Sequence, residues 1–366
     1  MRVRRTKPLI PEDLKNILIR GTNWIGDVVM TLPAVAAIRE TCPGAKISVL
    51  AKPWVAELYR ICGDVDAVIP YERMGDHKGT TGIIRLAREI RKGGYDGAIL
   101  LQNAIEAAII TWLAGIPIRG GYNSDGRGLL LTHSVRRTKE VRTVHQIHYY
   151  LEMVKALGFT ASGVSINLAV DDACRSEADG ILRRHHVERT DIIVGIAPGA
   201  TYGPAKMWFP DRFAAVADAL ADEFSARIIL FGSEADRPAT TSVQEHARHH
   251  LISLAGETTL KEAIAAISRC DLFISNDSGL MHLAGALDIP LVAIFGSTNP
   301  RTTSPVGDRS VIVHRDVSCS PCLKKVCPTD FRCMEVIGVH DVYHHARMLL
   351  ADRIGRRSMN GGVPSA

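Results

Sequence analysis

A short segment between two apolar runs carries the residues best suited to bind an anion. Residues 275–282 read Ser-Asn-Asp-Ser-Gly-Leu-Met-His. Cys270 to Ile274 before them is typical of a buried strand, and Leu280 to Leu287 after them has the pattern of a helix. A strand that enters a helix through small polar residues presents unpaired backbone N–H groups and the positive end of the helix dipole. The segment predicts either a diphosphate site or an ordinary turn in which Asp277 or Ser278 caps the helix.

A glycine-containing loop after an early apolar run ends in a carboxylate. Asn16 to Arg20 is typical of a strand, and residues 21–27 read Gly-Thr-Asn-Trp-Ile-Gly-Asp before a helix predicted from Val28 to Thr41. The G-x-G-x-x-G spacing of the dinucleotide fingerprint is absent. In parallel α/β sheets the ligand chemistry collects at the carboxyl ends of the strands. Asp27 is therefore well placed to take part in chemistry.

A third loop, Pro198 to Trp208, follows the apolar run Ile192 to Ile196. It offers backbone N–H groups, a hydroxyl and Lys206, which suit the phosphates of a nucleotide. The order G-x-x-x-x-G-K-[ST] of a P-loop is absent, so an ordinary surface lysine is the competing interpretation.

The elements that must position these loops alternate between strand and helix patterns. Such alternation with all-apolar strands predicts a parallel sheet covered on both faces, and it occurs twice. Periodicity weakens around Ser162 to Asp172, where we place a domain boundary. We expect an N-terminal domain over residues 1–170 and a second domain over 171–340, two Rossmann-like α/β domains facing across a cleft. Strands are predicted at 16–20, 46–50, 67–70, 95–101, 192–196, 227–231, 251–254, 270–274 and 291–295, and helices at 28–41, 55–62, 83–92, 105–115, 172–186, 210–224, 240–249 and 260–268.

Composition describes a globular enzyme and excludes a disordered or fibrous protein. The chain has 366 residues, of which 46% are hydrophobic, and a formal net charge of +5. Charges of both signs are interspersed, so this mild excess suits a small polyanionic ligand or an acidic membrane surface, and we expect no nucleic-acid partner. No apolar run reaches the roughly 18 residues of a membrane span, and no secretory signal is recognised. The sequence predicts a cytoplasmic protein.

Two clusters of residues in the sequence, one basic and one of cysteines, each allow more than one interpretation. Basic residues gather after the glycine-rich loop 123–128 and suit either a phosphorylated or carboxylated acceptor or a solvated surface: they are Arg127, Arg136, Arg137, Lys139 and Arg142. Half of the eight cysteines lie within fifteen residues, at Cys319, Cys322, Cys327 and Cys333. Their C-x2-C pair matches zinc spacing but the second pair is irregular, so structural zinc, a redox-active pair and plain reduced thiols all stay open.

Taken together, the three loops resemble those of the bacterial ADP-heptose:lipopolysaccharide heptosyltransferases, glycosyltransferase family 9. Residues 21–33 resemble the first loop of that family, residues 198–206 its phosphate loop, and residues 275–282 its donor-binding segment. The similarity extends from Asn16 to near Asp341. The Trp24 loop and the run Gly203-Pro204-Ala205-Lys206 are most similar to the heptosyltransferase II branch, whereas Thr201-Tyr202 departs from the acidic and aromatic pair found there.

This resemblance implies a GT-B fold and an inverting transfer of L-glycero-D-manno-heptose from ADP-heptose onto the first heptose of the lipopolysaccharide inner core. It implies that the segment 341–366 forms a helix returning to the N-terminal domain, followed by a flexible tail. It also implies that Asp27 is the general base and that Lys206 stabilises the departing diphosphate, with no metal or other cofactor required.

The remaining expected roles divide between donor and acceptor. We expect the donor to be bound by Thr201, Lys206, Glu234, Gly256, Asp277, Ser278, Gly279 and His282. Glu234 is a candidate for the ribose and Gly256 for the adenine. Trp24, Asn103 and Arg127 are expected to bind an anionic lipopolysaccharide core acceptor at the inner face of the inner membrane, where the protein makes peripheral contact.

Two alternatives to this function stay open. One is a heptosyltransferase I that acts on a Kdo acceptor, because the donor loops would look alike. The other is a non-catalytic module that binds a nucleotide-sugar or a metal through the cysteines.

Overall fold

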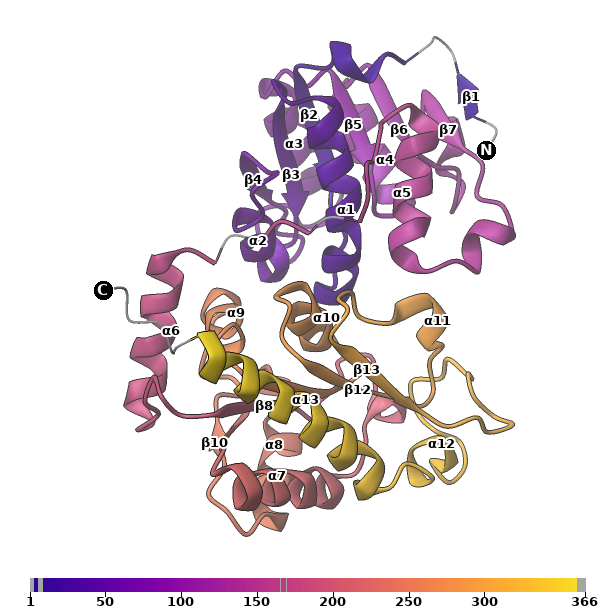
Figure 1. The fold of residues 1–366 in the computed structure, drawn as a ribbon. Coiled ribbons are helices and arrows are strands. Elements are labelled where there is room, and N and C mark those ends of the chain that lie inside the picture. The colour runs from indigo at the N-terminus through magenta and orange to yellow at the C-terminus, as the bar shows by residue number, and fades with distance from the viewer. Residues whose placement is uncertain (1–2, 6–8, 165, 169, 361–366) are drawn as a thin grey trace. The chain divides into compact units, whose positions relative to one another are not determined.

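The structure is a computed structural model that describes residues 3–5, 9–164, 166–168 and 170–360. The chain divides into two compact units, Met1–Ala169 and Val170–Ala366 (Figure 1). The tail expected to be flexible ends with residues 361–366, which lie outside the described residues. In the part that is described, no helix is both long enough and apolar enough to cross a membrane.

The first unit is built on a seven-stranded sheet in the order β1-β7-β6-β5-β2-β3-β4. All neighbouring strands are parallel except β1, which pairs antiparallel with β7. Without β1, the order is that of a Rossmann fold, in which the chain winds outward first to one side and then to the other. The strands are β1 (Val3–Arg5), β2 (Asn16–Arg20), β3 (Lys46–Ala51), β4 (Ala67–Pro70), β5 (Gly97–Leu100), β6 (Ile118–Tyr122) and β7 (His133–Val135).

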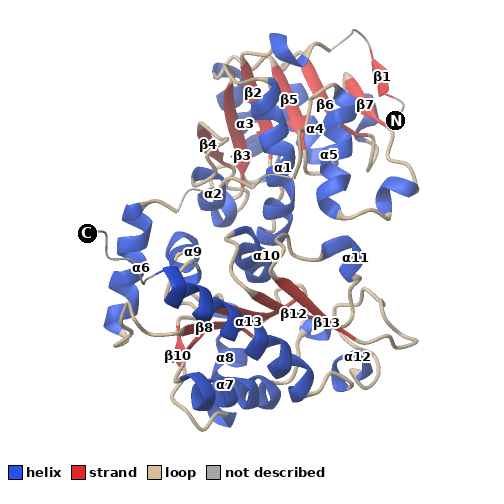
Figure 2. Ribbon diagram, viewed as in Figure 1, coloured by secondary structure: helices blue, strands red, loops and turns tan. Residues whose placement is uncertain are grey.

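Helices cover both faces of this sheet (Figure 2). On one face, Leu86 and Ile90 of α3 and Ala107 of α4 are buried against Leu18 and Leu100 of the central strands. On the other face, α1 packs between α2 and α5. The helices are α1 (Ile25–Thr41), α2 (Pro53–Arg60), α3 (Gly79–Lys92), α4 (Ile105–Leu113) and α5 (Gln146–Leu157).

The second unit repeats the same winding on a six-stranded parallel sheet in the order β10-β9-β8-β11-β12-β13. Its strands are β8 (Ile193–Ala197), β9 (Arg227–Leu230), β10 (Ile252–Ser253), β11 (Leu272–Asn276), β12 (Leu291–Phe295) and β13 (Ser310–His314). Its helices are α6 (Asp172–Arg184), α7 (Pro210–Phe224), α8 (Arg237–His246), α9 (Leu260–Ile267), α10 (Gly279–Ala286), α11 (Pro300–Thr303), α12 (Arg332–Glu335) and α13 (Val339–Asn360). The predicted α/β architecture with two Rossmann-like sheets is confirmed.

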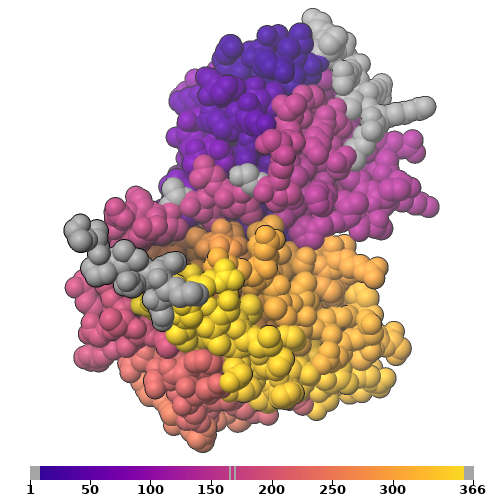
Figure 3. All heavy atoms as spheres, viewed as in Figure 1, coloured from indigo at the N-terminus to yellow at the C-terminus, as the bar shows by residue number. Residues whose placement is uncertain are grey.

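The last helix, α13, is longer than the sequence predicts and packs on the second unit. It contacts α7 and the strands β11, β12 and β13, and it buries Val342, Ala346 and Leu350 against them. Figure 3 shows its yellow atoms running along the surface of this unit. The expected return of this segment to the N-terminal domain stays a prediction.

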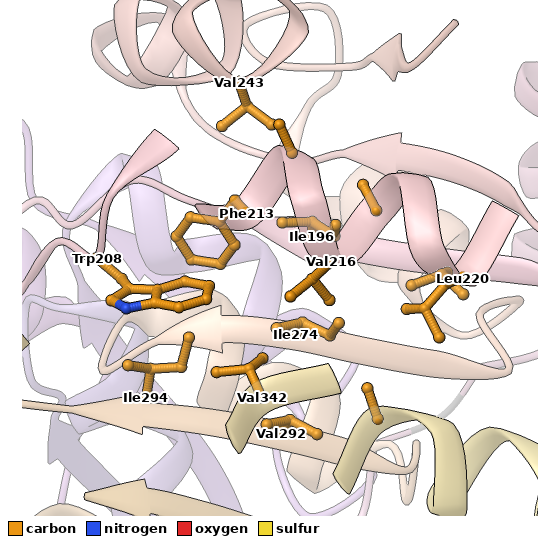
Figure 4. Close-up of a cluster of buried hydrophobic side chains, with 14 of the residues drawn as sticks. Ile196, Trp208, Phe213, Val216, Leu220, Val243, Ile274, Val292, Ile294 and Val342 are labelled. Carbon is orange, nitrogen blue, oxygen red and sulfur yellow. The ribbon is translucent and has the colours of Figure 1, made fainter. Parts of the chain in front are cut away.

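The two faces of the second sheet are sorted by the alternation of side chains along each strand. Val194 of β8 is buried in the layer of α7, α8 and α13, into which Ile196 also points (Figure 4). Ile193 and Ala197 point to the layer of α6, α9 and α10. Trp208 closes the first layer: it is 1% exposed, its ring meets that of Phe213 at an angle of 82°, and its indole N–H donates to the carbonyl of Ile337 at 3.0 Å.

Replacing Trp208 with alanine is expected to destabilise the second unit by about 3–5 kcal/mol, because the cavity left by a fully buried indole cannot close. Urea unfolding of the purified protein, followed by circular dichroism, measures this change. Trp112 is 52% exposed on α4, so its replacement with alanine is the matched control and should change the free energy of unfolding by less than about 1 kcal/mol. Equal losses in the two variants would contradict this assignment of the core.

Candidate active site

The polar loops of the second unit meet where its winding reverses direction. Strands β8 and β11 are neighbours at the centre of the sheet, and the chain builds outward from β8 on one side and from β11 on the other. In open α/β sheets, ligands bind at the carboxyl ends of the strands beside this reversal. The loop after β8 contains Lys206, and the residue after β11 is Asp277.

Asp277 is the centre of this site. Its side chain is 3% exposed, and its Oδ2 atom lies 2.6 Å from the Lys206 ammonium and accepts a hydrogen bond from the Thr298 hydroxyl at 2.6 Å. Lys206 belongs to a 3₁₀ turn (Pro204–Lys206), and Thr298 follows β12. The carboxylate thus joins loops from three neighbouring strands. An ammonium has three N–H donors, so Lys206 keeps two for a ligand beside Asp277.

The strand before Asp277 runs two residues further than the sequence predicts. Ser275 and Asn276, expected in the loop, belong to β11 and are fully buried. The Asn276 side chain donates to the carbonyl of Pro198 at 2.7 Å and accepts from the amide of Trp208 at 3.0 Å. Asn276 therefore binds both ends of the loop that contains Lys206. The polar side chains of Ser275 and Asn276 satisfy main-chain groups at the buried end of the strand. A strand predicted from hydrophobicity alone therefore ends before these two polar residues.

The amino end of α10 lies directly after Asp277. Ser278 is the N-cap residue, and its hydroxyl accepts from the amide of Met281 at 3.4 Å. The amides of Gly279 and of the next residue are the first of the helix and have no partner within it, which makes this end attractive to an anion. His282, expected to bind the donor, is buried within α10. The structure thus brings Lys206, Asp277, Ser278 and Gly279 together.

Glu234 and Gly256 lie close together in the same unit and form a second candidate contact for a ligand. Glu234 follows β9, and its Oε2 lies 2.8 Å from the Arg237 guanidinium. The same oxygen would be 2.3 Å from a methyl group placed on Gly256, whose φ is +71°. The positive φ favours glycine at this position, and a larger residue would displace the carboxylate. Two strand spacings, about 10 Å, separate β9 from β11, a distance that a ribose and a diphosphate can span. Thr201 is exposed in the loop after β8.

Replacing Glu234 with glutamine is expected to raise the KM for a nucleotide-sugar about tenfold with little change in kcat. A charged carboxylate binds a ribose hydroxyl more strongly than an amide does, and the ribose expected at Glu234 is remote from the bond between sugar and diphosphate. Steady-state kinetics with the donor varied measures the effect. Glu245, farther along the chain near the end of α8, is the control for loss of one charge, and its replacement with glutamine should leave KM unchanged.

In the first unit, Asp27 lies in the first turn of α1, after β2. It is half-buried and close to Tyr150 of α5. Burial raises the pKa of Tyr150 well above its usual value, and the charge of Asp27 adds to this rise. The loop before α1 is held at two points: the Tyr59 hydroxyl accepts from the amide of Thr22 at 3.2 Å, and the Trp54 indole donates to the carbonyl of Asn23 at 2.7 Å.

The three expected acceptor residues have different surroundings. Trp24 is 60% exposed and is the N-cap residue of α1. Asn103, after β5, donates to the Tyr149 hydroxyl at 3.0 Å and accepts from the Arg127 guanidinium at 3.1 Å. Arg127 is fully buried, and burial lowers its pKa to about 10.

The Arg127 guanidinium also donates to the main-chain carbonyls of Leu100, Gln102 and Tyr122. This side chain joins the loops after β5 and β6, and it must leave those carbonyls before it can touch an acceptor. Its burial is not visible in a sequence pattern that reads as a basic, solvated cluster. A direct contact of Arg127 with the acceptor stays a prediction.

The four clustered cysteines form no disulfide in the structure and lie in or beside one loop of the second unit. Burial raises the pKa of the Cys333 thiol, and the nearby thiols of Cys319, Cys322 and Cys327 add to that rise. Cys327 has a lowered pKa because main-chain N–H groups, that of Thr329 first, donate to its sulfur. Over the described part of the chain, no three histidine, cysteine, aspartate or glutamate side chains are arranged to bind a metal ion.

Comparison with known proteins agrees with this geometry. The model of glycosyltransferase family 9 (heptosyltransferase) matches residues 83–331. Lipooligosaccharide heptosyltransferase 2 of Haemophilus influenzae is 32% identical over an alignment of 311 residues, and the match covers 81% of this chain and 88% of that protein. The structure of ADP-heptose lps heptosyltransferase II of Escherichia coli superposes with a TM-score of 0.79 at 26% identity, covering 93% of this chain and 99% of that chain. Lipopolysaccharide heptosyltransferase 1 of Pseudomonas aeruginosa is 26% identical over an alignment of 330 residues, and the match covers 85% of this chain and 87% of that protein.

Two Rossmann-ordered sheets with a cationic loop at the point of reversal define a nucleotide-binding α/β protein. The chain belongs to glycosyltransferase family 9 and is an enzyme of that family. The resemblance recognised in the three loops is therefore confirmed. Asn276 and Thr298 are the two site residues that sequence reasoning missed. Thr298 had one available signal, its position directly after an apolar strand of the parallel sheet.

Proposed function

We propose that the protein transfers L-glycero-D-manno-heptose from ADP-heptose to the first heptose of the lipopolysaccharide inner core, with inversion at the anomeric carbon. The observation that carries this proposal is the buried contact of Lys206 with Asp277 beside the amino end of α10. Lys206 supplies a cation, and the amino end of α10 supplies unpaired N–H groups beside it. A diphosphate leaving group needs both. The greater identity to relatives named heptosyltransferase 2 than to those named heptosyltransferase 1 supports the choice of acceptor.

In this proposal the second unit holds the donor. The diphosphate lies against Lys206 and the amides around Ser278 and Gly279, Asp277 orients the heptose hydroxyls, and Glu234 binds the ribose. When the bond between the anomeric carbon and the diphosphate oxygen breaks, the electron pair stays on that oxygen. Lys206 stabilises the growing negative charge, which is why its contribution is larger in the transition state than in the bound donor.

Asp27 of the first unit is the proposed general base. The acceptor hydroxyl attacks the anomeric carbon from the face opposite ADP, and the Asp27 carboxylate takes the proton of that hydroxyl. The exposed indole of Trp24 offers an apolar face to an acceptor sugar. Asn103 and Arg127 support the loop that follows β5. The acceptor is anionic and membrane-borne, so we place the protein in the cytoplasm, in peripheral contact with the inner face of the inner membrane.

The release of ADP tests this proposal. The purified protein is incubated with ADP-heptose alone and with ADP-heptose plus a core acceptor that carries one heptose, and ADP is followed by a coupled assay. Rapid release is expected only with the acceptor present. Release at the same rate without acceptor would indicate hydrolysis of the donor, and no release under either condition would overturn the proposal.

A further inference from the structure

The loop that bears the cysteines is bonded to both loops that complete the Asp277 site. We call residues 315–331, between β13 and α12, the cysteine loop. The Tyr202 hydroxyl donates to the carbonyl of Leu323 at 2.7 Å, and the amide of Ala205 donates to the carbonyl of Lys325 at 3.0 Å. These bonds hold the loop that contains Lys206. The cysteine loop therefore borders the site on the side of its ammonium group.

The same loop also holds the segment after β12. The amide of Leu323 donates to the carbonyl of Ser297 at 2.8 Å, and the Ser320 hydroxyl donates to the carbonyl of Gly296 at 2.6 Å. Thr298, which donates to Asp277, comes next in the chain. Both side chains that bond to the Asp277 carboxylate are thus carried by loops anchored on the cysteine loop.

The main chains approach each other closely at Gly203. A methyl group placed on Gly203 would lie 2.4 Å from the carbonyl oxygen of Lys325, and the φ of Gly203 is +152°. Glycine is needed here for both reasons. A shift of the cysteine loop would therefore displace the turn that contains Lys206.

Two ammonium groups lie over one aromatic ring at this contact. The Nζ atom of Lys206 is 5.0 Å from the centroid of the Tyr202 ring, and that of Lys325 is 5.8 Å from it. A tyrosine ring attracts a cation within about 6 Å of its centroid. The ring therefore holds the positive charge of Lys325, in the cysteine loop, close to that of Lys206.

We propose that the cysteine loop is part of the donor site: it positions Lys206 and Thr298 around Asp277, and it supplies Lys325 as a second ammonium for the diphosphate. This inference rests on the proposed function, because it takes the ligand of the site to be a nucleoside diphosphate. Lys325 is a binding residue in this account, whereas Leu323 and Tyr202 are positioning residues.

Calorimetric titration with ADP and with adenosine tests the positioning role. Tyr202→Phe removes the hydroxyl that anchors Leu323 but keeps the ring under the two ammonium groups. It should weaken ADP binding about two- to tenfold and leave adenosine binding unchanged, since only the diphosphate meets Lys206. The matched control is Tyr343→Phe, which removes a hydroxyl hydrogen bond to Glu223 elsewhere in this unit and should leave both affinities unchanged.

The charge of the loop is tested with a neighbouring pair of lysines. Lys325→Met should weaken ADP binding about two- to fivefold at low salt, with a smaller loss at high salt, whereas Lys324→Met should have no effect. If the wild-type protein binds ADP but Tyr202→Phe and Lys325→Met bind it equally well, the inference is overturned. A loss of adenosine binding equal to that of ADP would also overturn it, because it indicates a general structural defect. Failure of the wild-type protein to bind ADP would overturn the proposed function itself.

Discussion

Replacing Asp27 with asparagine is expected to lower kcat/KM for heptose transfer about 10²–10⁴-fold, the usual contribution of a general base. The amide keeps the size of the side chain but cannot take the proton of the attacking hydroxyl. Binding of ADP-heptose should be unchanged, because all the proposed donor residues belong to the second unit. Transfer kinetics and calorimetric titration of the donor, carried out on one preparation, separate the two effects.

The control for this variant is another carboxylate in the first turn of a helix. Asp172 begins α6, and its side chain is fully exposed. Asp172→Asn should transfer heptose at the wild-type rate. Near-normal activity of Asp27→Asn would contradict its role as the base, and loss of donor binding in that variant would show that the side chain has another role.

Replacing Lys206 with methionine is expected to reduce kcat about 10²–10³-fold, the cost of removing one preorganised group that stabilises transition-state charge. The change has a second consequence because Asp277 is buried. A carboxylate left without its cation in that place costs about 3–5 kcal/mol, so the second unit should lose stability as well.

A double variant separates these two consequences. In Lys206→Met with Asp277→Asn, no charge is left unpaired, and the amide can still accept from the Thr298 hydroxyl. The free energy of unfolding should return toward the wild-type value while transfer stays lost. Recovery of transfer together with stability would show that Lys206 acts only through the fold, which contradicts its role at the diphosphate.

The sequence predicted the long regular elements well. The bounds of β2, α7 and β12 agree with Asn16–Arg20, Pro210–Phe224 and Leu291–Phe295, because each is an unbroken apolar or amphipathic pattern between clear breakers. Strand β6 contains Gly120 and Gly121 where apolar side chains are expected. A side chain at Gly120 would meet Leu157 at 2.8 Å, so glycine there serves the close packing of α5 on the sheet. Such a requirement belongs to tertiary structure and has no local signal.

The sequence predicted those residues of the site that follow an apolar strand. Lys206 and Asp277 each follow an apolar strand, and the parallel sheet brings them together. Asn276 was not predictable in its role, because its partners are main-chain groups 68 and 78 residues away. The burial of Arg127 has the same cause: three carbonyls at the carboxyl ends of β5 and β6, which are distant from Arg127 or from each other in the sequence, converge on one guanidinium.

The proposed reaction is the transfer of one heptose to a core that already carries its first heptose. The most direct measurement is the mass of two purified acceptors after incubation with ADP-heptose and the protein, one core ending in Kdo and the other carrying one heptose. For the proposed reaction we expect the second acceptor to gain the mass of a single heptose while the first is unchanged. Addition to the Kdo-terminated core alone, or to neither acceptor, would contradict it.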